Sequence, residues 1–243
     1  MRILIVNPNT TLSMTEKIGA AARAVAFPGT EIEAVSPAMG PVSIEGYYDE
    51  AFCVPGLLAE LKKGEARGCD GYVIACFDDP GLDAARQAVR GPVVGIAEAA
   101  MHVAALIGTS FTIVTTLARA VPTMEHLARK YGFAAHCRRV RAAEFPVLAL
   151  EDPDSDARGL LRAEISLAVQ EDRCESILLG CAGMADLNAS LSEEFGLPVI
   201  DGVAAATKLV EALVGLKLDT SKIGAYAPAL RKTYKGSFAG YAP

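Results

Sequence analysis

Two cysteines in matched positions are the residues of this chain whose chemistry is easiest to predict. Cys76 closes the stretch at residues 69–76, and Cys181 closes a similar stretch at 174–181, displaced by 105 positions. Each thiol follows an apolar run typical of a buried parallel strand, so it should lie in a loop of the kind where α/β sheets bind ligands. One such cysteine alone would more often be a core residue. A matched pair indicates a cleft with a thiol on each wall, and a thiol of pKa about 8.5 can serve as acid or base.

The elements that would position these thiols occur twice along the chain. Strand and helix periodicities alternate in both halves, and residues 113–114 repeat the strand pattern of residues 5–6. The strand that begins with proline at 198–200 likewise repeats the one at 92–94. This order predicts an α/β fold of two pseudo-symmetric parallel-sheet domains, with the active site in the cleft between them.

The turn after the first thiol carries two acidic residues. Asp79 and Pro80 are expected as the N-cap and first residue of a helix that ends near Arg90. The amides at the start of that helix would lie close to Cys76 and favour its thiolate, whereas the carboxylates of Asp78 and Asp79 would oppose it.

Composition excludes several classes of function. The 243 residues are 51% hydrophobic and carry a net charge of −6 without a Lys/Arg cluster, which argues against nucleic-acid and anionic-membrane partners. The most apolar window, residues 97–114, is interrupted by Glu98 and His102, so no membrane span is expected. Six cysteines and three histidines show no ligand spacing, so no metal is expected. The N-terminus lacks the features of a signal peptide, which predicts a reducing cytoplasm and free thiols.

Five segments resemble one known family. They are residues 7–10 (Asn-Pro-Asn-Thr), 75–82 (Ala-Cys-Phe-Asp-Asp-Pro-Gly-Leu), 114–116 (Val-Thr-Thr), 180–184 (Gly-Cys-Ala-Gly-Met) and 198–202 (Pro-Val-Ile-Asp-Gly). The chain resembles the aspartate/glutamate/hydantoin racemase superfamily over its whole length, and within it most closely hydantoin racemase. The resemblance implies cofactor-independent racemisation next to a carbonyl by Cys76 and Cys181 acting on opposite faces. It also implies that the C-terminal helix returns to the first half, so the domains would be 1–96 plus about 208–243, and 97–207.

Two departures from the superfamily pattern bear on the substrate. Amino-acid racemases of this superfamily usually carry an Asp in the loop after the first strand and a His two residues after the second cysteine. Here those places hold Asn7 or Asn9, and Gly183. A hydantoin ring needs less help than a free amino acid, because its C5 proton is flanked by a carbonyl and its enolate is shared with the ring. We therefore expect 5-monosubstituted hydantoins as substrates, and no turnover of glutamate or aspartate.

Eight further residues are candidates for substrate binding. Backbone amides after each cysteine could stabilise the enolate oxygen, neutral side chains at equivalent strand ends could contact the ring, and the long loop at 36–48 could hold the C5 substituent. Turn and capping roles explain the neutral side chains about as well, the amides also suit helix starts, and ordinary packing explains any single residue of the loop better. The candidates are Phe77, Asp78, Ala182 and Gly183 for the amides, Asn7, Thr115 and Thr116 for the ring, and Ile44 for the substituent.

Several functions fit the same motifs. Racemisation of allantoin or another ureide differs from the leading hypothesis only in the substrate. Malonate decarboxylation needs one cysteine, so the second thiol counts against it, and maleate isomerisation would use a cysteine as a nucleophile. A non-catalytic binding protein with two buried thiols stays open. For all of these the expected partner is a small molecule, and we expect a homo-oligomer.

Overall fold

Two parallel sheets form the framework of the protein. The computed structural model covers residues 1–243 and contains eight strands. The first sheet has the order β2-β1-β3-β4 and the second the order β6-β5-β7-β8, each with every pairing parallel. The strands are β1 (Arg2–Val6), β2 (Glu31–Val35), β3 (Gly71–Ile74), β4 (Val93–Gly95), β5 (Phe111–Thr115), β6 (Cys137–Ala142), β7 (Ser176–Leu179) and β8 (Val199–Ile200). Identical strand order in the two sheets confirms the predicted pair of pseudo-symmetric halves.

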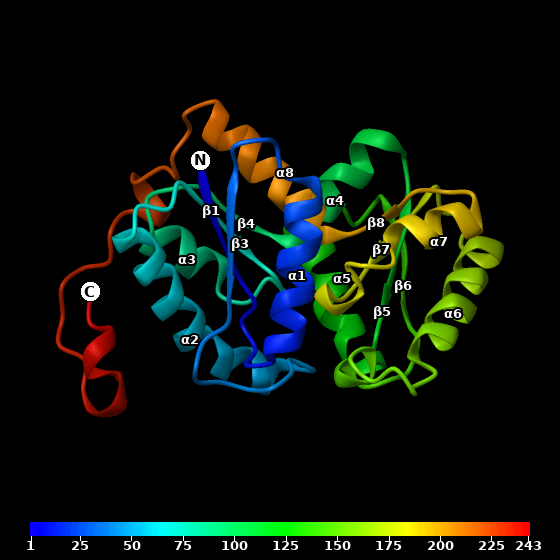
Figure 1. The fold of residues 1–243 in the computed structure, drawn as a ribbon, viewed down its shortest axis with the longest axis horizontal. Coiled ribbons are helices and arrows are strands. Elements are labelled where there is room, and N and C mark those ends of the chain that lie inside the picture. Colours follow the sequence, from blue (N-terminus) through cyan, green and yellow to red (C-terminus); the bar gives the residue numbers. More distant parts are fainter.

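Eight α-helices connect and cover the strands (Figure 1). They are α1 (Leu12–Val25), α2 (Tyr47–Ala66), α3 (Leu82–Ala88), α4 (Ile96–Ile107), α5 (Val121–Lys130), α6 (Ala157–Glu171), α7 (Asn188–Phe195) and α8 (Gly202–Gly215). The helices α1, α4 and α8 lie between the two sheets, while α2 and α3 cover the outer side of the first sheet and α6 and α7 that of the second (Figure 1). No helix is long and apolar enough to cross a membrane.

The largest of three hydrophobic clusters runs through both halves, and each half also has a smaller cluster of its own. The largest cluster of buried apolar side chains includes Ile5 and Val73 of the first sheet together with Ile113 and Leu178 of the second. The helix α4 contacts β4 on one side and β7 and β8 on the other. Burial of this shared surface fixes the orientation of the two sheets relative to each other.

The last helix returns to the first half. The helix α8 contacts β1, β3 and β4, and its approach to β3 is so close that a Cβ at Gly71 would collide with Val210. The proposed domain limits at 96 and 208 stay a prediction, because the central helices and the shared core give no clean place to divide the chain.

The expected helix start after the first thiol is wrong. The helix α3 begins at Leu82, with Gly81 as its N-cap at φ 64°. The Asp79 carboxylate accepts hydrogen bonds from the amides of Ala97 and Glu98 at the start of α4 instead. A Cβ at Gly95, the N-cap of α4, would collide with this carboxylate, so glycine there makes room for a cap supplied by a distant loop.

Candidate active site

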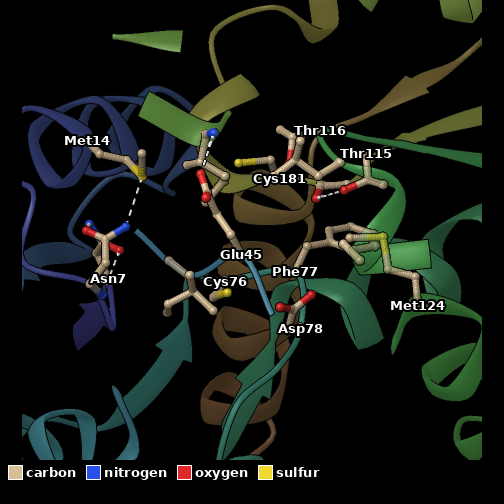
Figure 2. Close-up of a pocket in the computed structure, with 18 residues that line it drawn as sticks. Asn7, Met14, Glu45, Cys76, Phe77, Asp78, Thr115, Thr116, Met124 and Cys181 are labelled. Atoms are coloured by element: carbon tan, nitrogen blue, oxygen red, sulfur yellow. Dashed lines mark hydrogen bonds between the residues drawn. The ribbon is translucent and has the colours of Figure 1, made fainter. Parts of the chain in front are cut away.

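The loops after four strands meet at one cavity between the halves (Figure 2). Parallel strands end at the same edge of a sheet, so the loops after β1, β3, β5 and β7 carry their side chains to one place. Nine predicted site residues line this cavity of about 40 Å³: Asn7, Ile44, Cys76, Phe77, Asp78, Thr115, Thr116, Cys181 and Ala182. The tenth, Gly183, lies directly behind the second thiol, where a Cβ would be 3.6 Å from the Cys181 sulfur. The two thiols lie on opposite sides of the cavity in Figure 2.

Nine further lining residues were not predicted as site residues. They are Asn9, Met14, Glu45, Ala75, Leu117, Ala120, Met124, Val147 and Gly180. Sequence carried a signal for three of them, because Ala75 and Gly180 precede the thiols and Asn9 lies in the turn after β1. Met124 and Val147 come from elements far along the chain and reach the cavity only through tertiary packing.

A tight contact between two strands sets the position of Cys181. A Cβ at Gly180 would lie 2.9 Å from Cβ of Thr115, closer than real side chains approach. The Thr115 hydroxyl donates to the Gly180 carbonyl at 3.2 Å. Thr115 is therefore held against the strand that carries the second thiol, and its hydroxyl proton is already used in a hydrogen bond within the protein.

The loop after β1 is held together by its own amide side chains. Asn7 is buried, and its Nδ2 donates to Asn9 Oδ1 at 2.8 Å and to Thr15 Oγ1 at 3.0 Å. Its Oδ1 accepts from the Asn9 backbone amide at 3.3 Å. These contacts give Asn7 the turn-forming role that the sequence also allowed.

The Cys76 thiol lies in a strongly acidic environment. Burial raises its pKa well above the ordinary value, and the Asp78 carboxylate raises it further. A hydrogen bond from the Asp78 backbone amide acts in the opposite direction, and the charge of Cys181 adds a smaller increase in the pKa. Cys76 should therefore rest as the thiol.

The Cys181 thiol lies in a more balanced environment. Burial raises its pKa to about 11, while a hydrogen bond from the Gly183 amide lowers it. The Asp78 carboxylate raises the pKa as well. Lys17 lowers the pKa and Glu151 raises it by smaller amounts, and these two side chains form an ion pair at 2.7 Å. Of the two thiols, Cys181 is thus the easier to ionise.

The amides that follow the thiols divide into two pairs. Those of Asp78 and Gly183 donate to the sulfurs. Those of Phe77 and Ala182 donate to no backbone carbonyl, and both residues line the cavity. The second pair is therefore available to donate to an oxygen of a bound molecule.

The charge of the cavity differs from the expectation of neutral polar groups. Two carboxylates line it, those of Glu45 and Asp78, and no Lys, Arg or His does. The Glu45 Oε1 accepts from the Val147 amide at 2.8 Å, which ties the long loop of the first half to the second half. Burial, with Glu50 nearby, raises the pKa of Asp78 to about 7. No three His, Cys, Asp or Glu side chains are grouped so that they could hold a metal ion.

Comparisons with known proteins agree on one family. The Asp/Glu/Hydantoin racemase family model matches residues 3–210. A hydantoin racemase of Rhizobium meliloti is 52% identical over 227 residues, which cover 93% of this chain and 94% of that protein. The solved allantoin racemase from Klebsiella pneumoniae has a TM-score of 0.98 at 52% identity and covers 100% of this chain and 99% of that one. A solved arylmalonate decarboxylase, with a TM-score of 0.60 at 17% identity, covering 88% of this chain and 92% of that one, shares the fold alone.

This chain belongs to the Asp/Glu/hydantoin racemase family, which confirms the resemblance seen in the sequence. Within that family its relatives make it an isomerase, and specifically a racemase.

Proposed function

We propose that the protein racemises 5-monosubstituted hydantoins without a cofactor, using Cys76 and Cys181 as acid and base on opposite faces of C5. The observation that carries this proposal is that two thiols from equivalent strand ends line one small cavity. A carbon held between them can lose its proton to one sulfur and receive a proton from the other, which inverts its configuration. The lower pKa of Cys181 favours it as the base in the resting enzyme, with Cys76 as the acid.

The enolate oxygen would be stabilised by backbone amides. Removal of the C5 proton places negative charge on the neighbouring carbonyl oxygen of the ring. The free amides of Phe77 and Ala182 are the donors in reach of the cavity. Preorganised donors of this kind commonly contribute about 10²- to 10³-fold in rate.

Charge in the cavity favours a neutral ring over an acidic substrate. Glutamate, aspartate, maleate and malonates all carry carboxylates, and here they would meet Glu45 and Asp78 with no cationic side chain to pair with. Desolvation of an unpaired carboxylate is costly. This argument disfavours decarboxylase and maleate isomerase activity, and it predicts that glutamate and aspartate are not racemised.

The deciding experiment follows configuration and exchange together. An enantiopure 5-alkylhydantoin is incubated with the enzyme in D2O, and optical rotation and C5 deuterium content are measured against a control without enzyme. We expect rotation to decay faster than in the control while deuterium enters C5. Glutamate and aspartate are tested under identical conditions. The proposal would be refuted if optical rotation of the hydantoin decayed no faster than in the control, or if either amino acid were racemised at a rate comparable to the hydantoin.

A second candidate substrate is allantoin, which is a hydantoin with a ureido group at C5. The observation that favours it is the carboxylate of Glu45 in the cavity, because a carboxylate can accept hydrogen bonds from ureido N–H groups. Comparing kcat/KM for allantoin and a 5-alkylhydantoin, in the wild type and in Glu45→Gln, separates the two. If allantoin is the preferred substrate, the substitution should lower its kcat/KM selectively.

Three wider expectations belong to this proposal. The partner is a small cyclic ureide, with neither nucleic acid nor a membrane involved. The proposed place of action is the reducing cytoplasm, where all six cysteines would stay free thiols. The chain is proposed to form a homo-oligomer, and light scattering after gel filtration would measure its mass.

A further inference from the structure

Asp78 is a buried carboxylate without a hydrogen-bond partner. Its residue is 8% exposed, and no hydrogen bond to its side chain influences its pKa, which responds only to burial and to the charge of Glu50. The carboxylate oxygens are not among the fully enclosed unpartnered atoms of the structure, so they face the cavities that Asp78 lines. An acid without a protein partner that faces open cavities beside a thiol is free to exchange protons with what fills them.

The same side chain joins two cavities. Asp78 lines the active-site cavity with Cys76, and it also lines a second cavity of about 330 Å³ between α2, α3 and α5. It is the one residue that the linings share. The second cavity includes half-buried Glu50 and exposed His126 and Lys130, so it connects Asp78 with the surface. In Figure 2 the Asp78 carboxylate lies on the same side of the active-site cavity as Cys76, opposite Cys181.

The proposed reaction creates a need for such a connection. When Cys181 takes the C5 proton and Cys76 donates its own, the enzyme is left with a Cys76 thiolate and a Cys181 thiol. The next molecule of the same enantiomer needs the opposite arrangement. A proton must therefore reach Cys76 and another must leave Cys181 before the same direction can be repeated.

We propose, building on the function proposed above, that Asp78 is a proton carrier that reprotonates Cys76 from solvent, with Glu50 as the next group toward the surface. In this step the O–H bond of the Asp78 carboxylic acid breaks and an S–H bond forms at Cys76. The Asp78 carboxylate then regains a proton from Glu50, which is reprotonated by water in the second cavity. The Cys181 thiol passes its proton to water in the active-site cavity, so charge and atoms balance.

The electrostatics of the route suit this role. A pKa of about 7 leaves Asp78 partly protonated at neutral pH, and burial also raises the pKa of Glu50, although Lys130 opposes that increase. A proton carrier works best when its pKa is near the working pH. Three sets of titratable and charged groups surround Asp78. Cys76, Cys53 and Glu50 act on it or respond to it, Tyr47, Asp79, Asp83, His126 and Lys130 line the second cavity, and Glu45 and Cys181 lie across the active-site cavity.

The test separates a proton carrier from a group that binds substrate. Asp78→Asn and Glu50→Gln are compared with the wild type for kcat and kcat/KM on each enantiomer of a 5-alkylhydantoin. The measurements are made at pH 6, where the wild type and Asp78→Asn carry nearly the same charge at residue 78, because Asp78 is then mostly protonated. The return step occurs in the free enzyme after product release, so its slowing lowers kcat and KM together and leaves kcat/KM unchanged. We expect kcat to fall about tenfold in Asp78→Asn and severalfold in Glu50→Gln, with kcat/KM within about twofold of the wild type.

Two controls complete the experiment. Asp83→Asn changes a carboxylate that lines only the second cavity and pairs with Lys130 at 2.9 Å, and it should leave kcat unchanged. Added imidazole should restore kcat in Asp78→Asn by delivering protons, and should not raise kcat of the wild type.

Equal losses in kcat and kcat/KM would overturn the proposal and assign Asp78 to substrate binding. Unchanged kcat in both variants would overturn it as well. A wild-type enzyme inactive on hydantoins would overturn both this proposal and the proposed function.

Discussion

The Cys76 loop and the Cys181 loop have the same position in two equivalent halves but different electrostatic surroundings. Beside Cys76 lies the buried carboxylate of Asp78, which raises the pKa of the thiol. In the matching place beside Cys181 lies Gly183, with the Lys17 ammonium near enough to lower the thiol pKa. The comparison teaches that a repeated framework can place two identical thiols symmetrically and still make them unequal as acids.

The two halves also differ in how the helix after the fourth strand of each sheet is capped. In the second half Asp201 caps α8 itself, accepting from the amides of Val203 and Ala204 at 3.0 and 2.9 Å. In the first half the N-cap of α4 is Gly95, and Asp79 of the cysteine loop supplies the carboxylate. Asp79 also accepts from the Tyr131 hydroxyl at 2.8 Å, so this loop is fixed to the second half.

The largest expected effect comes from removing either thiol. Cys76→Ser and Cys181→Ser should each abolish racemisation, a loss of at least about 10²- to 10⁴-fold, because serine is too weak a base or acid here. Each variant should still exchange the C5 proton of one enantiomer with D2O through the remaining thiol. Exchange should be faster in Cys76→Ser, which keeps the more easily ionised Cys181. Equal exchange rates would show that the thiols are equivalent, and racemisation at the wild-type rate would refute the two-thiol mechanism.

A second substitution should make the Cys181 loop resemble the Cys76 loop. Gly183→Asp places a carboxylate beside Cys181, where the added Cβ meets the flexible Leu150 side chain at 3.0 Å. A like charge should raise the Cys181 pKa by about one unit and lower activity at pH 8 about tenfold. Because the base must be the thiolate, the rise of activity with pH should shift to higher pH. Gly183→Asn is the matched neutral control, and an identical pH profile in both variants would contradict the electrostatic explanation.

The two capping carboxylates provide a third comparison. Asp79→Ala and Asp201→Ala should each lower the free energy of unfolding by about 1 kcal/mol through loss of a helix cap. Only Asp79→Ala should also lower activity, about fivefold, because it releases the Cys76 loop. Denaturant unfolding and initial rates measure the two effects, and equal activities would contradict this division.

The stability change should also depend on pH. Burial raises the pKa of Asp79 to about 7 and that of Asp201 to about 6, above the value of about 3.9 in an unfolded chain. The folded protein therefore binds these protons more tightly, and the stabilisation that this provides is complete below pH 4 and lost as pH rises to about 7. Each substitution should thus cost more stability at pH 5 than at pH 8. A cost independent of pH would contradict the raised pKa values.

The smallest effect should follow the loss of the cation near Cys181. Lys17→Met removes the charge that lowers the Cys181 pKa and leaves Glu151, which raises it. Activity at pH 8 should fall about threefold, with the activity rise again moved to higher pH. Lys17→Arg keeps the charge and should restore most of the rate. Profiles of kcat/KM against pH test this.

The sequence predicted the repeated framework and the two thiols because those features are local. Four apolar residues before each cysteine and the spacing of 105 define strand ends directly, and nine of ten predicted site residues line the cavity. The predictions that were wrong concern residues whose role depends on tertiary contacts. Asp79 and Pro80 have the local pattern of a helix start, yet the Asp79 carboxylate caps α4 by accepting from amides 18 and 19 positions further along the chain. Glu45 and Val147 meet only because a loop of one half reaches the other.

The shared core has a consequence for how the protein unfolds. Because side chains of both sheets belong to one apolar cluster, separation of the halves would expose to water a surface that neither half can cover alone. The helix α8 packs on β3 of the first half but follows the second half in the sequence, so the first half lacks one of its helices until the second half has been synthesised. The racemase should therefore melt in one cooperative transition, and neither half should be stable as a separate fragment.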